Sequence, residues 1–144
     1  MRVLLIDDHT LVRKGLEQLL QSRGVEIAAS VGSGREGVSQ ALALKPDIVL
    51  LDMKMPDMNG TETLKQLRAA GVSAPILMLT MSREEQDLQA ALRNGAQGYL
   101  LKDMDPEDLV PALQDALLGN NVVAKELIGS LTRLVQGQTA RTAA

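Results

Sequence analysis

Ile48-Val49-Leu50-Leu51-Asp52 is an uninterrupted apolar run that ends on a carboxylate. The residues after it include Pro56 and the pair Asn59-Gly60, which are strong turn signals. A short apolar run closed by turn residues is typical of a buried strand in a parallel sheet. Because ligands bind at the carboxyl edge of such sheets, the run predicts that Asp52 lies at a reactive edge on a rigid element.

Four other short apolar runs share this character, at residues 3–6, 25–31, 76–79 and 98–101. Segments with helical spacing of apolar residues separate and follow them, at 10–23, 33–45, 61–70, 82–94 and 105–118. Strands that alternate with helices predict an α/β fold with a doubly wound (flavodoxin-like) five-stranded parallel sheet. We expect strand order 2-1-3-4-5 with helices on both faces.

Local signals refine three of these helices. Ser33 and Ser82 each stand three residues before a glutamate, which predicts a capping box at both helix starts. Asp105 is the expected cap of the last helix, followed by Pro106 at its first position. Pro111 then falls beyond the first turn, where it should remove one backbone hydrogen bond and bend the helix.

The chain beyond Gly119 has a different character. An apolar stripe continues at helical spacing through Val122, Val123, Leu127, Ile128, Leu131, Leu134 and Val135. Residues after 136 are small and polar, as in a linker. We therefore expect a main domain at 1–120, an extra C-terminal linker helix at 121–136 and a flexible linker or tail at 137–144.

Composition excludes several classes of protein. The 144 residues suit one compact domain, and with 45% hydrophobic residues but no Phe, no Trp and one Tyr, the core must be aliphatic. A net charge of −3 does not favour a nucleic-acid-binding surface, and the absence of cysteine excludes disulfides and thiolate metal sites. No apolar run approaches the roughly 18 residues that span a membrane. With no signal peptide at Met1, we expect a cytoplasmic protein.

Polar side chains follow four of the predicted strands where each strand ends. Asp7 and Asp8 follow the first, Asp52 the third, Thr80 closes the fourth and Lys102 follows the fifth. Three carboxylates at one edge repel each other, and Mg²⁺ would relieve that repulsion. A hydroxyl and an ammonium can hold phosphoryl oxygens, and one carboxylate can then act as a nucleophile toward phosphorus. The pattern therefore predicts an aspartyl-phosphate site.

These residues resemble the receiver domain of two-component response regulators, and more narrowly the NarL/FixJ class with a LuxR-type output. The resemblance rests on Leu5-Ile6-Asp7-Asp8-His9, Val49 to Pro56, Asn59-Gly60, Thr80 and Gly98 to Asp103, and it covers about residues 2 to 135. Five dispersed positions in the right order on the right strands are a more specific signal than one short motif.

The resemblance implies a role for each matching residue. Asp52 would accept a phosphoryl group from a sensor histidine kinase, with Thr80 and Lys102 binding that group. Mg²⁺ would be held by Asp7, Asp8, Asp52 and the backbone carbonyl of Lys54. Tyr99 would change rotamer together with Thr80, although an ordinary strand tyrosine is an equally good interpretation of it. His9 is better explained by a structural role at a helix start than as a catalytic base.

Some residues depart from the general receiver pattern. Met81 stands where many receivers carry a small residue, so it could restrict access to the phosphoryl group. Lys54 places a cation near the site and could alter the rate of hydrolysis. Asp103 follows Lys102 where many receivers have proline, which supports the NarL-type assignment.

The resemblance implies a phosphorylation-controlled switch in a phosphorelay, and not a turnover enzyme beyond its own phosphorylation and slow dephosphorylation. It implies transcription regulation through a DNA-binding output domain, which we expect to be absent from this chain. Homodimerisation on phosphorylation is a further hypothesis. The alternatives are a phosphorylation-independent (pseudo-receiver) interaction module and a Mg²⁺-dependent phosphatase. The phosphatase generally needs a second aspartate where this chain has Lys54.

Overall fold

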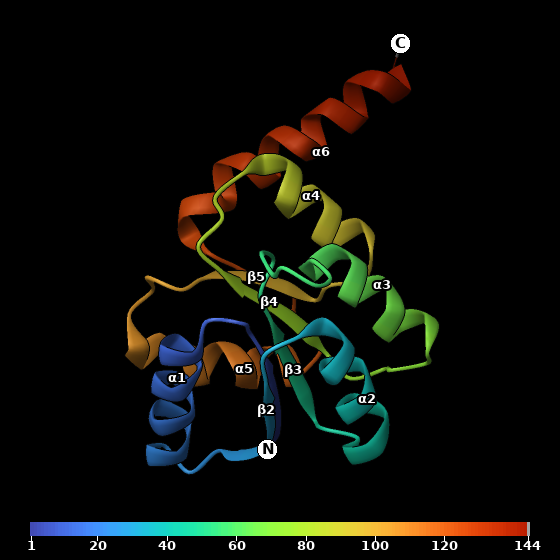
Figure 1. The fold of residues 1–144 in the computed structure, drawn as a ribbon. Coiled ribbons are helices and arrows are strands. Elements are labelled where there is room, and N and C mark those ends of the chain that lie inside the picture. Colours follow the sequence, from blue (N-terminus) through green and yellow to red (C-terminus); the bar gives the residue numbers. More distant parts are fainter. Residues whose placement is uncertain (144) are drawn as a thin grey trace.

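A six-stranded parallel sheet forms the centre of the molecule, as seen in a computed structural model that describes the backbone of residues 1–143 and the side chains of residues 1–136 (Figure 1). The strand order is β2-β1-β3-β4-β5-β6. The strands are β1 (Arg2–Ile6), β2 (Glu26–Val31), β3 (Ile48–Leu51), β4 (Ile76–Thr80), β5 (Gly98–Leu101) and β6 (Val122–Val123). The doubly wound parallel fold and the order of the first five strands are confirmed.

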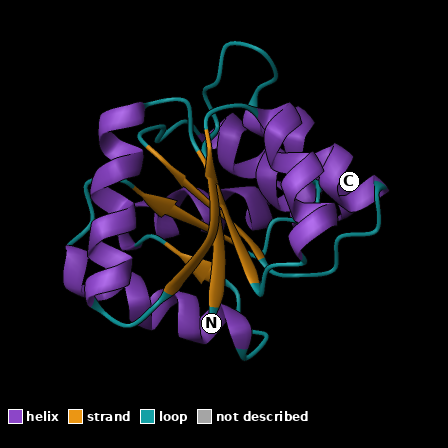
Figure 2. Ribbon diagram, turned by 60° about the horizontal axis from the view of Figure 1, so that its bottom comes forward, coloured by secondary structure: helices purple, strands orange, loops and turns teal. Residues whose placement is uncertain are grey.

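Helices cover both faces of the sheet (Figure 2). The helices are α1 (Thr10–Ser22), α2 (Gly34–Leu44), α3 (Gly60–Ala69), α4 (Glu85–Arg93), α5 (Leu109–Leu117) and α6 (Ile128–Ala143), with short 3₁₀ turns η1 (Pro106–Asp108) and η2 (Lys125–Leu127). One apolar cluster joins the sheet to α2, α3 and α4, and a second joins it to α1 and α5. The two clusters leave the strands buried on both faces, which explains their continuous apolar sequences.

The prediction of five strands is wrong by one. Val122 and Val123, expected in a helix, pair instead with Gly98 and Tyr99 of β5. A Cβ at Gly98 would overlap the backbone oxygen of Val122, so glycine permits this close approach. Two residues are too short for a strand pattern to be recognised in sequence.

The C-terminal helix consequently begins later than predicted, at Ile128, after η2. It lies beside α4 (Figure 1), with Leu127 buried at its base and an ion pair of 2.9 Å between Arg133 and Glu85. The C-terminal helix also ends later than predicted, because its backbone continues to Ala143 through the region 137–144 that we expect to be a flexible linker or tail. The side chains of 137–144 and the backbone of Ala144 lie outside the described part of the chain. Among the described residues, no helix is long and apolar enough to cross a membrane.

Two predictions about helix starts are corrected. Ser33 does cap α2 by accepting a hydrogen bond from the Glu36 amide, but Ser82 caps no helix, since α4 begins at Glu85 after an N-cap at Glu84. Asp105 caps the 3₁₀ turn η1, and α5 begins only at Leu109. Pro111 therefore lies in the first turn of α5, where proline is tolerated, instead of in the helix interior.

Candidate functional site

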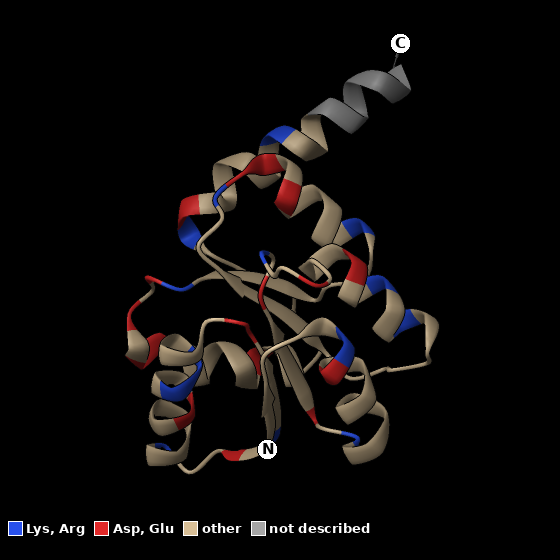
Figure 3. Cartoon of the chain, viewed as in Figure 1, with Lys and Arg blue, Asp and Glu red and all other residues tan. Residues whose placement is uncertain are grey.

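Three carboxylates meet at the carboxyl edge of the sheet, after β1 and β3. Figure 3 shows acidic segments, in red, in the loops that follow the central strands. One oxygen from each of Asp7, Asp8 and Asp52 lies within 4.8 Å of the others. Asp7 and Asp52 are only 4% and 6% exposed, whereas Asp8 is exposed. Backbone amides hold the two buried groups, because Asp7 Oδ1 accepts from His9 N at 2.9 Å and Asp52 Oδ1 accepts from Met53 N at 2.8 Å. His9 itself is the N-cap residue of α1, which confirms its predicted position at a helix start.

Lys102, at the end of β5, places one positive charge against this acidic cluster. Its Nζ lies 2.7 Å from Asp7 Oδ2 and 3.0 Å from Asp52 Oδ2. Burial by itself lowers the pKa of Lys102, but its hydrogen bonds to Asp7 and Asp52, together with their charges, outweigh burial and raise it. Lys102 is therefore a fixed cation between the two buried carboxylates.

Thr80 and Tyr99 are joined through the backbone of Ser82. Thr80 Oγ1 accepts a hydrogen bond from Ser82 N at 3.2 Å, and Tyr99 donates its hydroxyl proton to Ser82 O at 3.0 Å. Both side chains are buried, with Thr80 1% and Tyr99 0% exposed. Thr80 and Tyr99 therefore contact the same residue, Ser82, through the two peptide groups on either side of its Cα.

The single tyrosine allows a direct test of this burial. Burial raises the pKa of Tyr99 to about 12, although the side chain of Ser82 opposes that shift. Since the chain has no other aromatic residue, the absorbance of phenolate near 295 nm reports Tyr99 alone. We expect its titration to be centred near pH 12 in the folded protein and about two units lower in urea, near the ordinary value for tyrosine.

The raised pKa of Tyr99 also determines how the stability of the protein changes with pH. Between the two midpoints the folded state retains a proton that the unfolded chain has lost, so stability falls as the pH rises through this range. A folded-state midpoint close to that of the urea-unfolded chain would contradict the buried, hydrogen-bonded position of Tyr99.

Most of the predicted site residues line one cavity of about 320 Å³, namely Asp8, Asp52, Lys54, Thr80, Met81 and Lys102, with His9 beside them. Asp7 lies against the same cluster, buried under Lys102. Tyr99 does not line the cavity. The Met81 side chain is 64% exposed, so it stands at the opening of the cavity instead of closing it.

Residues 3–114 match the sequence model of the response regulator receiver domain. The chain belongs to this family. It is 41% identical over 141 residues to the nitrate/nitrite response regulator protein NarL of Escherichia coli, a match that covers 97% of this chain and 65% of that protein. A nitrate/nitrite response regulator homolog of Haemophilus influenzae is 42% identical over 128 residues, covering 88% of this chain and 62% of the relative.

Structural comparison agrees with these sequence matches. The receiver fold superposes on a LuxR-family two-component response regulator from an Aurantimonas species with a TM-score of 0.86 and 30% identity, covering 92% of this chain and 95% of that one. The chain is thus a NarL-like receiver domain, and receiver domains are not a classical enzyme family. It spans less than two thirds of the length of the curated relatives named above.

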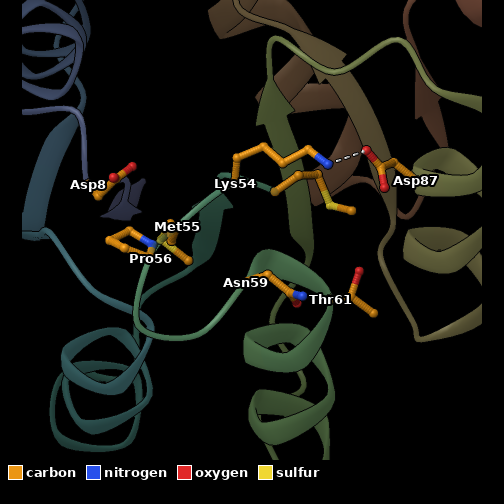
Figure 4. A pocket seen from close by; sticks show the side chains of 8 residues that line it. Asp8, Lys54, Met55, Pro56, Asn59, Thr61 and Asp87 are labelled. Carbon is orange, nitrogen blue, oxygen red and sulfur yellow. Dashed lines mark ion pairs between the residues drawn. The ribbon is translucent and has the colours of Figure 1, made fainter.

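Sequence reasoning missed two polar residues beside the receiver site. Ser82 Oγ donates a hydrogen bond to Asp87 Oδ2, and the same oxygen pairs with Lys54 Nζ at 3.2 Å. Asp87 and Lys54 also line a second cavity of about 410 Å³ next to Asp8 (Figure 4). In sequence, an acidic residue in the first turn of a helix is explained by its favourable interaction with the helix dipole. Only the folded β4–α4 loop shows that Asp87 lies beside the receiver site.

Proposed function

We propose that this receiver domain is a phosphorylation-controlled switch and that Asp52 accepts a phosphoryl group from a sensor histidine kinase of a two-component system. The observation that carries the proposal is the arrangement around Asp52. A buried carboxylate at a strand end has a lysine at 3.0 Å and two further aspartates within 4.8 Å. Such a group can attack phosphorus while the cation offsets charge on the phosphoryl oxygens.

The residues present fit a divalent cation. Three carboxylates offer oxygens close enough together to bind one hard ion, and the backbone carbonyl of Lys54 would add a fourth protein ligand. Bound there, Mg²⁺ would supply positive charge that offsets the charge on the transferred group. We propose Asp7, Asp8 and Asp52 as its side-chain ligands.

Each step of the transfer then has a residue assigned to it. An Asp52 oxygen forms a bond to phosphorus, while the bond from phosphorus to the donor nitrogen of a phosphohistidine breaks and that nitrogen takes up a proton. Lys102 exchanges its contact with Asp52 Oδ2 for a phosphoryl oxygen. Thr80 gives up the Ser82 amide and turns its hydroxyl toward the new group, and Tyr99 rearranges with it. Met81 and Lys54, at the rim of the cavity, modulate access.

The output follows from the family relationship. We propose that the switched surface controls a DNA-binding transcription-regulator domain, and that the protein works in the cytoplasm beside its kinase. Its own catalysis would be limited to taking up the phosphoryl group and slowly losing it. Phosphorylation-dependent homodimerisation belongs to the same proposal.

Intact mass measurement tests the proposed function. We expect wild type incubated with Mg²⁺ and a small acyl-phosphate donor to gain one phosphoryl group, and Asp52→Asn to gain none. Omitting Mg²⁺ should suppress the gain on wild type, because the carboxylate cluster then lacks its cation. An adduct on Asp52→Asn would contradict the assignment. If neither protein reacts with the donor or with a competent kinase, the domain is a phosphorylation-independent binding module.

A further inference from the structure

Lys54 is the second residue after the proposed phosphoacceptor, yet its side chain points away from the acidic cluster. Figure 4 shows it extending toward Asp87 and away from Asp8. Its Nζ lies 3.2 Å from Asp87 Oδ2, and its side chain is 64% exposed. A long, exposed lysine has many rotamers available, so this orientation depends on its partner.

Asp87 is the fixed member of this pair. Its side chain is only 15% exposed and also accepts a hydrogen bond from Ser82 Oγ. It lies in the first turn of α4, which Leu88 and Ala91 anchor in the core. The ion pair therefore holds Lys54 against a rigid helix. Asp87 stays in place if Lys54 adopts another rotamer.

Lys54 also lines the cavity of about 320 Å³ that opens onto Asp52. A phosphoryl group on Asp52 would bring two negative charges into that cavity and compete with Asp87 for the Lys54 ammonium. The outcome of this competition decides whether the Lys54 side chain stands in the path of a water molecule that approaches phosphorus from the side opposite Asp52.

We infer that Asp87 is a positioning residue that holds Lys54 off the phosphoryl site and thereby shortens the lifetime of the Asp52 acyl phosphate. The inference rests on the proposed function. In hydrolysis, a water oxygen forms a bond to phosphorus, the bond from phosphorus to the Asp52 oxygen breaks, and Asp52 leaves as a carboxylate. The water protons end on the inorganic phosphate and the solvent.

A released Lys54 slows that reaction because its side chain fills part of the path that the attacking water takes. Pairing with Asp87 prevents this obstruction.

The test compares acyl-phosphate half-lives after the donor is removed, with Mg²⁺ present, by the decay of the phosphorylated mass. We expect Asp87→Asn, and Asp87→Ala as a second variant that favours the helix, to lengthen the half-life about two- to fivefold, the range that a partly exposed ion pair can supply. In a Lys54→Met background, which keeps an apolar side chain but no charge, the same substitutions should leave the half-life unchanged.

Glu85→Gln is the matched control. It removes the same charge from the same turn of α4, but Glu85 pairs with Arg133 and not with Lys54. Its half-life should equal that of wild type. A change as large as that of Asp87→Asn would assign the effect to helix electrostatics and overturn the inference.

Two further outcomes separate this inference from the proposed function. Equal half-lives for wild type and both Asp87 variants, or a lengthening that persists in full with Lys54→Met, would overturn the positioning role and leave Asp52 as phosphoacceptor. Absence of any adduct on wild type would overturn the proposed function and the inference together.

Discussion

Replacing Lys102 by methionine is expected to lower the free energy of unfolding by about 3 kcal/mol in the absence of divalent cations, the range found when one partner of a buried ion pair is removed. Lys102 Nζ is the cation that Asp7 and Asp52 share, at 2.7 and 3.0 Å. Methionine keeps most of the side-chain volume, so the loss measures charge and hydrogen bonding and not a cavity. Urea denaturation followed by circular dichroism measures it.

Magnesium should reverse part of this loss. In wild type the ion competes with Lys102 for carboxylate oxygens, whereas Lys102→Met lacks the ammonium that pairs with Asp7 and Asp52. We expect Mg²⁺ to raise the melting temperature of the variant more than that of wild type, because binding to the folded state alone stabilises it.

Lys54→Met is the matched control for this prediction. It removes a lysine at the rim of the same cavity whose side chain is 64% exposed, so its cost should stay below about 1 kcal/mol. Equal stabilities of the Lys102 and Lys54 variants, or an equal Mg²⁺ response of Lys102→Met and wild type, would show that Lys102 does not neutralise the buried carboxylates.

Gly60→Ala is expected to impair both stability and phosphorylation. Gly60 is the first residue of α3 and donates its amide proton to Met53 O at 2.8 Å. A Cβ there would overlap the backbone oxygen of Asp52 and lie 2.6 Å from Met53 Cα. Because these are backbone atoms, the segment that carries Asp52 must move, at a cost of about 1–3 kcal/mol as in overpacked cores.

Gly15→Ala provides the comparison, since a Cβ at Gly15, inside α1, meets nothing within 4 Å. That variant should be as stable as wild type or up to about 1 kcal/mol more stable, and it should be phosphorylated normally. For both variants, urea denaturation gives the stability and intact mass measurement gives the yield of phosphoryl adduct. A Gly60→Ala protein with the stability and adduct yield of Gly15→Ala would contradict the proposed tight contact.

The positions that the sequence predicts correctly are those with local signals. Asp7, Asp8, Asp52, Thr80 and Lys102 each end or follow an apolar run, and parallel strands bring such ends to one edge. Periodicity and turn residues are properties of neighbouring residues, so one chain suffices to recognise them. The arrangement of those five residues around one cluster could therefore be predicted before the fold was known.

The features that the sequence did not predict depend on tertiary contacts. β6 exists because Gly98 lets Val122 approach, which no pattern in residues 121–136 indicates. Ser82 has the sequence of a capping residue, but its hydroxyl is bound to Asp87 and its backbone to Thr80 and Tyr99. These are contacts among three segments, and helix signals describe only one segment at a time.

Locating the phosphoryl group tests the central proposal most directly. Borohydride reduces an acyl phosphate of aspartate to homoserine, so phosphorylated wild type can be reduced, digested and sequenced by fragment mass. We expect homoserine at position 52 and unmodified aspartate at Asp7 and Asp8. Homoserine at Asp7, Asp8 or any other carboxylate, with Asp52 unchanged, would contradict the proposal that the Lys102-paired carboxylate is the phosphoacceptor.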